Sequence, residues 1–276
     1  MLTQAPPQLV AEDLAVELRR MIIEMAASPN GVHVGGSLSI ADLLAVLHAE
    51  VLRHPAAAGP PVERDYLVLS KGQASAALYA ALAATGVLPE AELASYAEQG
   101  GRLAGHPMKK LPGVLFSTGS LGHGLSLGLG VALAGRRFGR DSRAFVVLGD
   151  GELQEGSNWE AAMAASHHGV DNLVAIVDRN DWQITGRTED VMSLEPLAGK
   201  WAAFGWRVLC VDGHDHGQIR HALTTPVETA RPTVILARTI KGRGLPGLAD
   251  TKKSHSATLD LATRQQALAD LAGERS

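Results

Sequence analysis

The stretch AFVVLGDGELQEGSNWEAAMAASHHGVDNLVAIVDRN, residues 144–180, contains two apolar runs that each lead into a polar residue. The first run, AFVVLG, leads to Asp150, and the second, NLVAIVDR, leads to Asn180. Near-continuous apolar runs of this length are typical of strands that are covered on both faces of a sheet. The residues between them predict a crossover helix, and a strand–helix–strand unit implies parallel pairing. Asp150 and Asn180 would then follow the carboxyl ends of two strands, where open α/β sheets bind their ligands.

The alternation of strands and helices continues on both sides of this stretch. Further apolar runs predict strands over residues 65–70, 206–211 and 233–239. The spacing of apolar residues predicts an amphipathic helix over residues 8–27, and residues 258–272 are expected to form a surface helix. We therefore predict an α/β fold, a single doubly wound domain over residues 1–276 with a mostly parallel sheet flanked by helices.

The remaining segments are expected to combine helices with long loops. Helices are predicted over residues 41–52, 74–86, 90–98 and 121–139. Residues 28–37, SPNGVHVGGS, are expected to form a loop, because Pro and Gly interrupt the helical pattern. Residues 100–120 show no regular pattern, and an irregular stretch of this length with interspersed lysines favours a functional loop. Gly124 and Gly128 share a face of their predicted helix, which would permit close contact with another helix.

The composition is that of an ordinary globular protein, with 46% hydrophobic and 20% charged residues. A formal net charge of −4 argues against a broad nucleic-acid-binding face, and an aromatic content of 4% argues against base-stacking platforms. The apolar runs are shorter than the roughly 20 residues that span a bilayer. Acidic residues near the N-terminus argue against a signal peptide. We expect a cytoplasmic protein that binds neither nucleic acid nor a membrane.

The chain has one cysteine, Cys210, which lies in the apolar run RVLCV. A single thiol cannot form a disulfide within its own chain, and its neighbours predict a small core residue in a reducing compartment. The alternative, a reactive nucleophile, has no supporting residue nearby in the sequence.

Asp150 and Asn180 supply the oxygen ligands that a hard cation such as Mg²⁺ prefers. Gly149 and Gly151 would let the backbone approach phosphate groups closely. A Gly-Asp-Gly followed by an Asn 30 residues after the Asp therefore predicts a diphosphate–Mg²⁺ site. Each element alone has a simpler explanation, because Gly-Asp-Gly often forms a turn and an Asn after a strand is often a cap.

Five ordered segments extend the pattern and resemble the N-terminal half of transketolase. They are GVHVGGSLSIADLLAVLH, DYLVLSKGQASAALYAALA, AGHPMKKLPGVLFSTGSLGHGLSLGLGVALAGR, GDGELQEGSNWEAAMAASHH and TIKGRG. The GDG and the later Asn resemble the thiamine-diphosphate-binding motif itself. The similarity covers roughly residues 8–260, and it implies the thiamin diphosphate-binding fold of the diphosphate-binding (PP) type.

The resemblance implies two cofactors, thiamine diphosphate and Mg²⁺ or another divalent cation. The contacts it implies are Asp150, Asn180 and the carbonyl of Trp182 on the metal, Gly151 and Glu152 at the diphosphate, and Gly119, Ser120 and Leu121 at the aminopyrimidine. His33, His106 and His255 fall on positions that face the reacting carbons, and His106 resembles a residue that hydrogen-bonds a donor hydroxyl. Glu155 resembles a glutamate that couples two active sites across a subunit interface.

These residue types suit ketol transfer. The reaction passes through alkoxides and an enediol-like carbanion, and histidines exchange protons with such oxygens near neutral pH. The electron sink is the thiazolium ring, so the protein supplies orientation and charge.

Two positions depart from the transketolase pattern. The usual SKGH is SKGQ, with Gln73 at a position near the diphosphate, and the usual HPGG is HVGG, with Val34. Glutamine forms hydrogen bonds but cannot carry a positive charge, and loss of a proline loosens the loop backbone. Both changes bear on the substrate, and neither removes a metal ligand.

Transketolase takes an aminopyrimidine-binding glutamate and an apolar ring cradle from its next domain, across a dimer interface. No second strand–helix series follows TIKGRG. We therefore expect a second polypeptide to supply the pyrimidine-binding and C-terminal domains, in an α₂β₂ assembly. The helix with Gly124 and Gly128 and the N-terminal helix are candidate contact surfaces.

The resulting interpretation is one subunit of a transketolase that moves a two-carbon ketol unit from a ketose, expected to be phosphorylated, to an aldose or other acceptor. Lys109 and Lys110 would suit anionic substrates. One alternative is acyl transfer to a lipoyl or carrier-protein thiol, as in 2-oxo-acid dehydrogenases. Another is a non-catalytic binding or regulatory subunit, although Asp150, Asn180 and the three histidines speak against it.

Overall fold

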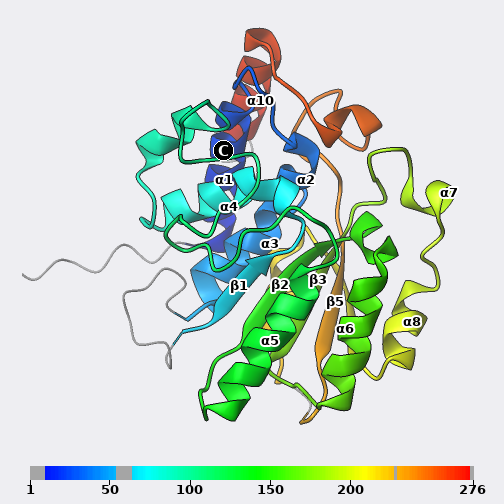
Figure 1. The fold of residues 1–276 in the computed structure, drawn as a ribbon. Coiled ribbons are helices and arrows are strands. Elements are labelled where there is room, and N and C mark those ends of the chain that lie inside the picture. Colours follow the sequence, from blue (N-terminus) through cyan, green and yellow to red (C-terminus); the bar gives the residue numbers. More distant parts are fainter. Residues whose placement is uncertain (1–9, 54–63, 227–228, 274–276) are drawn as a thin grey trace, which may run out of the picture.

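The computed structural model describes residues 10–53, 64–226 and 229–273, and a five-stranded sheet lies at its centre (Figure 1). The strands are β1 (Tyr66–Leu69), β2 (Ala144–Gly149), β3 (Leu173–Arg179), β4 (Arg207–Asp212) and β5 (Thr233–Arg238). Their order is β1-β2-β3-β5-β4, and every neighbouring pair is parallel. The predicted α/β fold is confirmed, and β2 and β3 are direct neighbours.

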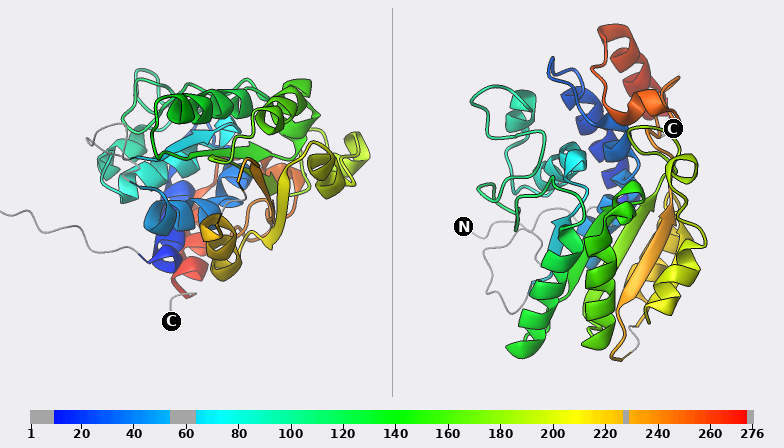
Figure 2. Two further views of the ribbon diagram at one scale, coloured as in Figure 1. Left: turned by 90° about the horizontal axis from the view of Figure 1, so that it is seen from below. Right: turned by 45° about the vertical axis from the view of Figure 1, so that its right-hand side comes forward.

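Helices cover both faces of the sheet and give three layers (Figure 2). One side carries α5 (Gly124–Arg137), α6 (Gly156–His167) and α8 (Leu197–Ala203), and the other carries α1 (Ala11–Met25), α3 (Ala41–Val46), α4 (Ser75–Ala84) and α9 (His216–Thr224). Alternate residues of β2 point to opposite faces. Phe145 and Val147 therefore belong to one apolar core, whereas Val146 and Leu148 belong to the other.

The first and last helices of the described chain pack against each other. They are α1 and α10 (Leu261–Gly273), close to the predicted ranges 8–27 and 258–272. Residues 8 and 9 of the first range lie outside the described residues. Within the part of the chain that the structure describes, no helix is both long enough and apolar enough to cross a membrane.

Short helical segments connect these elements. They are α2 (Val34–Leu38), α7 (Thr188–Val191), the π-helix η1 (Leu47–Val51) and the 3-10 helices η2 (Gly72–Ala74), η3 (Glu90–Ser95), η4 (Gly151–Gln154) and η5 (Lys252–His255). Residues 100–120 contain neither helix nor strand, as the sequence predicted.

Two predicted segments differ from the structure. The expected loop over residues 28–37 contains α2, and the expected helix over residues 90–98 is the shorter η3. The glycines of α2 allow close packing instead of breaking the helix. A Cβ atom on Gly35 would lie 2.5 Å from the carbonyl oxygen of Ser254 and 2.9 Å from Cγ of Lys241.

Gly124 and Gly128 share a buried face of α5, but that face contacts the sheet and not another helix. A Cβ atom on Gly128 would collide with the side chain of Val146 in β2, and one on Gly124 would collide with Ser70. The two glycines therefore bring α5 close to strands β1 and β2.

The prediction that Cys210 is a core residue is wrong, because its side chain is exposed. Cys210 belongs to β4, which forms an edge of the described sheet. An apolar run does not distinguish an edge strand from a central one, since that difference depends on pairing with distant segments.

Candidate functional site

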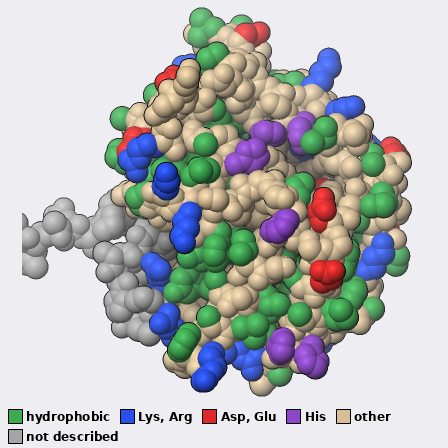
Figure 3. All heavy atoms as spheres, in the orientation of Figure 1, with side chains coloured by type: hydrophobic (Ala, Val, Ile, Leu, Met, Phe, Trp, Pro, Cys, Tyr) green, Lys and Arg blue, Asp and Glu red, His purple; other side chains and the backbone are tan. Residues whose placement is uncertain are grey.

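A cavity of about 460 Å³ opens at the carboxyl ends of β2 and β3, and it collects most of the predicted site residues. The predicted residues in its lining are His33, Gln73, His106, Gly119, Leu121, Gly149, Asp150, Gly151, Glu152, Glu155, Asn180, Trp182 and His255. Ser120 is exposed and does not line the cavity. Histidine side chains gather near the centre of this face of the molecule (Figure 3). The residues are thus brought together, while the individual roles stay predictions.

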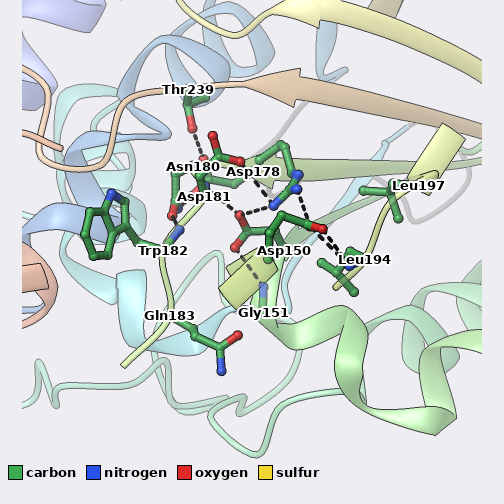
Figure 4. Close-up of polar contacts among 12 residues, drawn as sticks. Asp150, Gly151, Asp178, Asn180, Asp181, Trp182, Gln183, Leu194, Leu197 and Thr239 are labelled. Atoms are coloured by element: carbon green, nitrogen blue, oxygen red, sulfur yellow. Dashed lines mark hydrogen bonds and ion pairs between the residues drawn. The ribbon is translucent and has the colours of Figure 1, made fainter. Parts of the chain in front are cut away.

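Asp150 follows β2 directly and is almost completely buried, with 1% of its surface exposed. Its carboxylate accepts hydrogen bonds from the backbone N–H groups of Gly151 and Asp181, each at 2.7 Å (Figure 4). Nη1 of Arg179 lies 3.2 Å from the same carboxylate. Burial raises the pKa of Asp150 to about 6, and the neighbouring Asp178 adds to this effect. The partners within the protein therefore compensate the charge of Asp150 only in part, which favours a cation beside it.

Asn180 follows β3, and the β2–β3 pairing brings it to the same edge of the sheet as Asp150 (Figure 4). Its Nδ2 donates to the carboxylate of Asp178 at 2.7 Å, and its Oδ1 accepts from the backbone N–H of Trp182 at 3.1 Å. Because a carboxylate only accepts and an N–H only donates, these two bonds fix which end of the amide is oxygen.

The predicted metal ligands form an all-oxygen set of one carboxylate, one amide and the main-chain carbonyl of Trp182. Among the residues that the structure describes, no group of three or more His, Cys, Asp or Glu side chains is arranged to hold a metal. Mg²⁺ commonly takes only one or two protein carboxylates and completes its octahedron with phosphate and water oxygens. The residues present therefore fit a Mg²⁺ ion that a bound diphosphate helps to coordinate.

Asp178 lies at the end of β3, and its side chain is fully buried. It accepts hydrogen bonds from the side chains of Ser39, Lys71, Asn180 and Thr239. Burial by itself raises the pKa of Asp178, but the charge of Lys71 and the hydrogen bonds outweigh burial and hold the pKa below its usual range. Asp178 therefore stays ionised and orients the amide of Asn180.

The three predicted histidines lie beside one another. The ring centroid of His33 is 5.9 Å from that of His106 and 5.4 Å from that of His255. Nζ of Lys241 lies 3.1 Å from Nδ1 of His255. Burial, followed by the charge of Lys241, lowers the pKa of His255 to about 4, and burial also lowers the pKa of His33. Neutral imidazoles in this position can donate hydrogen bonds to substrate oxygens or accept them from hydroxyls.

Two buried lysines are the main residues of the cavity that sequence reasoning missed. Lys71 and Lys241 line it and are 1% and 3% exposed. Burial lowers the pKa of Lys241 to about 8, and the charge of Lys71 contributes. Both residues lie next to glycine in the segments SKGQ and TIKGRG, which the resemblance had already singled out. The other lining residues not predicted are Gly36, Gln154, Gln183, Ile184 and Thr185.

Glu152 lines the cavity, but its carboxylate is engaged by the protein itself. It accepts hydrogen bonds from the hydroxyl of Ser70 and from the backbone N–H groups of Gly122 at 2.9 Å and Gly149 at 3.0 Å. These donors belong to three separate segments of the cavity wall. The carboxylate therefore braces the wall, and this contact set differs from a direct contact with the diphosphate.

We expect Glu152→Gln to lower the melting temperature of the chain. The amide group of glutamine would direct a donor toward at least one of the three donors that the carboxylate now accepts from. Leaving a buried polar group unsatisfied costs about 1–3 kcal/mol, and each kcal/mol shifts the melting temperature of a chain of this size by about 2–4 °C. Differential scanning calorimetry measures the change. Glu160→Gln, at an exposed position of α6, is the control, and an equal effect of both substitutions would contradict the bracing role.

The predicted aminopyrimidine turn packs against the histidines. Gly119 has a φ of 153°, and a Cβ atom on it would lie 3.0 Å from Cδ2 of His106. Glu155 precedes α6 and packs on the same turn, because a Cβ atom on Gly122 would lie 2.6 Å from Cβ of Glu155. Its role in coupling two active sites stays a prediction.

The chain matches the family described as "Transketolase, thiamine diphosphate binding domain" over residues 10–271. One of the two apulose-4-phosphate transketolase subunits of Phocaeicola vulgatus is 39% identical over 238 residues, which cover 86% of this chain and 85% of that protein. The 6-deoxy-6-sulfo-D-fructose transketolase subunit SqwG of a Clostridium species is 39% identical over 270 residues, which cover 97% and 98% of the two chains.

Longer proteins match over part of their length. The transketolase of Pongo abelii is 35% identical, and the match covers 94% of this chain but 42% of that protein. The crystal structure of transketolase from Campylobacter jejuni superposes with a TM-score of 0.87 at 30% identity, covering 95% of this chain and 42% of that one. The chain thus spans less than half the length of these longer relatives.

Proposed function

This chain belongs to the transketolase family, in the part described as the thiamine diphosphate-binding domain, and we propose that it acts as one subunit of a two-polypeptide transketolase. One observation carries the proposal. An all-oxygen set of predicted metal ligands, two buried lysines and three histidines line one cavity. Relatives that are named as single subunits of a transketolase, and that match over most of their own length, support the division into two polypeptides.

The residues of the cavity divide into two groups by what they would bind. Asp150, Asn180 and the carbonyl of Trp182 would hold Mg²⁺ against the cofactor's diphosphate, and Lys71 and Lys241 bring positive charge to the same cavity. When bound, thiamine diphosphate supplies the electron sink for the two-carbon unit.

The second group would act on the sugar. His33, His106 and His255 lie beside one another, where they would hydrogen-bond the hydroxyl and carbonyl oxygens of a ketose. Low pKa values keep His33 and His255 neutral, so each can donate from one ring nitrogen and accept at the other.

We propose an anionic sugar as the substrate. The names of two relatives carry a phosphate and a sulfo group, respectively, on the sugar. Lys109 and Lys110 are exposed in the loop over residues 100–120, which also carries His106 into the cavity. These two lysines do not line the cavity itself, so they would meet the charged end of a longer substrate. The relatives described above are named as transketolases, and we do not propose acyl transfer to a carrier thiol.

A partner subunit would complete the site. In the proposed assembly it supplies the pyrimidine-binding and C-terminal domains, and two copies of each chain form an α₂β₂ complex. The Ile184 side chain lines the cavity and is 65% exposed, which suits a surface that a partner covers. The cytoplasmic location expected from the composition stays a prediction.

We expect the purified chain alone to show no ketol transfer, and the chain mixed with its partner to do so. The test supplies thiamine diphosphate, Mg²⁺, a phosphorylated ketose and an aldose, and follows the shortened sugar product by mass spectrometry. A matched reaction with the unphosphorylated ketose tests the anionic substrate. Turnover by the isolated chain would contradict the proposed division, and a pair that binds the cofactor but transfers no ketol unit would contradict the activity.

A further inference from the structure

The segment that follows β5 carries Lys241 into the cavity and is held by its main chain. The N–H of Thr239 donates to the carbonyl of Arg179 at 3.1 Å, and the N–H of Gly242 donates to the carbonyl of Gly35 at 2.9 Å. Between these two points lies Ile240, whose side chain is 40% exposed. Packing of that side chain therefore does little to fix the backbone at this position.

The N–H of Ile240 instead donates to Nε2 of His214 at 2.8 Å. His214 lies just after β4 and does not line the cavity. It lines a separate groove of about 550 Å³ along β4. The imidazole thus contacts the cavity segment from behind.

The two ring nitrogens of His214 have different, determined roles. A backbone N–H can only donate, so Nε2 must be an unprotonated acceptor. The proton therefore sits on Nδ1, which donates to Oδ2 of Asp42 at 2.7 Å. Asp42 is itself held by an ion pair with Arg19 and by Nε2 of His216 at 2.8 Å. The side chain of His214 is 7% exposed and has one tautomer that satisfies both partners.

We propose that His214 is a positioning residue of the site, which holds the main chain at Ile240 so that Lys241 reaches the cofactor end of the cavity. Nζ of Lys241 lies 3.3 Å from the carbonyl of Trp182 and 3.1 Å from Nδ1 of His255, one residue beyond the anchored N–H. Without the anchor, the turn would be held only at Thr239 and Gly242. The consequence for cofactor binding rests on the function proposed above, whereas the anchor itself does not.

Two substitutions separate the two bonds of His214. The side-chain amide of Asn reaches about as far as Nδ1 of histidine, and that of Gln reaches about as far as Nε2. His214→Asn can therefore keep the donor to Asp42 but loses the acceptor for Ile240. His214→Gln can keep the acceptor for Ile240 but loses the bond to Asp42. A residue that only satisfied Asp42 would tolerate Asn better than Gln, and the positioning role predicts the reverse.

The first measurement is hydrogen exchange at the Ile240 amide of the full chain, followed by NMR. We expect exchange about five- to tenfold faster in His214→Asn, since a hydrogen bond of ordinary strength is lost, and nearly unchanged in His214→Gln. His221→Asn, at an exposed position of α9, is the control for a histidine-to-asparagine change. Equal exchange rates in the Asn and Gln variants, or faster exchange in Gln, would overturn the proposal.

The second measurement is the half-saturating concentration of thiamine diphosphate with Mg²⁺ and the partner subunit. We expect about a five- to tenfold increase in His214→Asn and recovery in His214→Gln. Exchange rates that follow the expected order in a chain that binds no thiamine diphosphate would uphold the anchor and contradict the proposed function. Cofactor binding with equal exchange in both variants would do the opposite.

Discussion

Asp150→Asn is expected to weaken metal-dependent binding of thiamine diphosphate by at least about 100-fold, equivalent to roughly 2.7 kcal/mol. Asp150 is the only carboxylate in the predicted ligand set, and it is almost completely buried at the end of β2. A neutral amide offers an oxygen to Mg²⁺ but no charge, and a buried divalent ion needs both.

Isothermal titration calorimetry with thiamine diphosphate at several Mg²⁺ concentrations, on the chain together with its partner, measures the effect. Asparagine matches the volume of Asp150 and keeps an acceptor for the N–H of Gly151. The melting temperature therefore serves as the check that the variant is folded.

Asp181→Asn is the matched control. Asp181 lies 3.1 Å from the same guanidinium of Arg179 that contacts Asp150, but its side chain is 43% exposed and it is not a predicted ligand. Its φ of 64° is one that asparagine adopts readily. The control should bind the cofactor within about threefold of the wild-type chain, a difference of less than 1 kcal/mol. Unchanged affinity in Asp150→Asn would remove the metal site from the proposal.

The sheet and the position of the cavity were predictable because they depend on local patterns. The apolar runs ending at Gly149 and Arg179 are long enough to identify as buried strands, and parallel pairing follows from the helix between them. Asp150 and Asn180 then reach one edge of the sheet without any knowledge of side-chain contacts. The resemblance to transketolase supplied the histidines, which no periodicity would have brought together.

The features that the sequence did not reveal depend on partners far apart in the chain. Cys210 is exposed because β4 pairs on one side only, and Gly128 packs on Val146 of β2 instead of a helix. Both results depend on the order of strands and not on the local pattern of apolar residues.

Glu152 illustrates the same limit within the site. Its motif suggested contact with the diphosphate, but its carboxylate accepts from Ser70 and Gly122, which lie in other segments. A motif places a residue near a ligand, whereas the number of donors around its side chain decides what it binds.

Lys71→Met is expected to lower the melting temperature of the apo chain by about 6–20 °C. The side chain of Lys71 is 2% exposed, and its Nζ forms an ion pair with the fully buried Asp178 and donates to the carbonyl of Gly36 at 2.9 Å. Among the described residues, this is the only ion pair of Asp178. Removing one partner of a buried pair costs about 3–5 kcal/mol, and each kcal/mol corresponds to about 2–4 °C.

Lys241→Met is the matched control, because Lys241 is buried in the same cavity but its Nζ contacts a carbonyl and an imidazole and no carboxylate. Burial already disfavours its charge, since it lowers the pKa of Lys241 to about 8. We expect the apo melting temperature of Lys241→Met to stay within about 3 °C of the wild-type value, less than the effect of 2 kcal/mol. Its affinity for thiamine diphosphate should fall about tenfold, as for the loss of one charged hydrogen bond.

A double-mutant cycle identifies the cause of the Lys71 effect. If the loss arises from the unpaired charge of Asp178, adding Asp178→Asn to Lys71→Met should restore part of the stability, because the second change removes that charge. If the loss arises from altered packing around the methionine, the second change should lower the melting temperature further. Equal melting temperatures for Lys71→Met and Lys241→Met would show that the ion pair does not stabilise this end of the sheet.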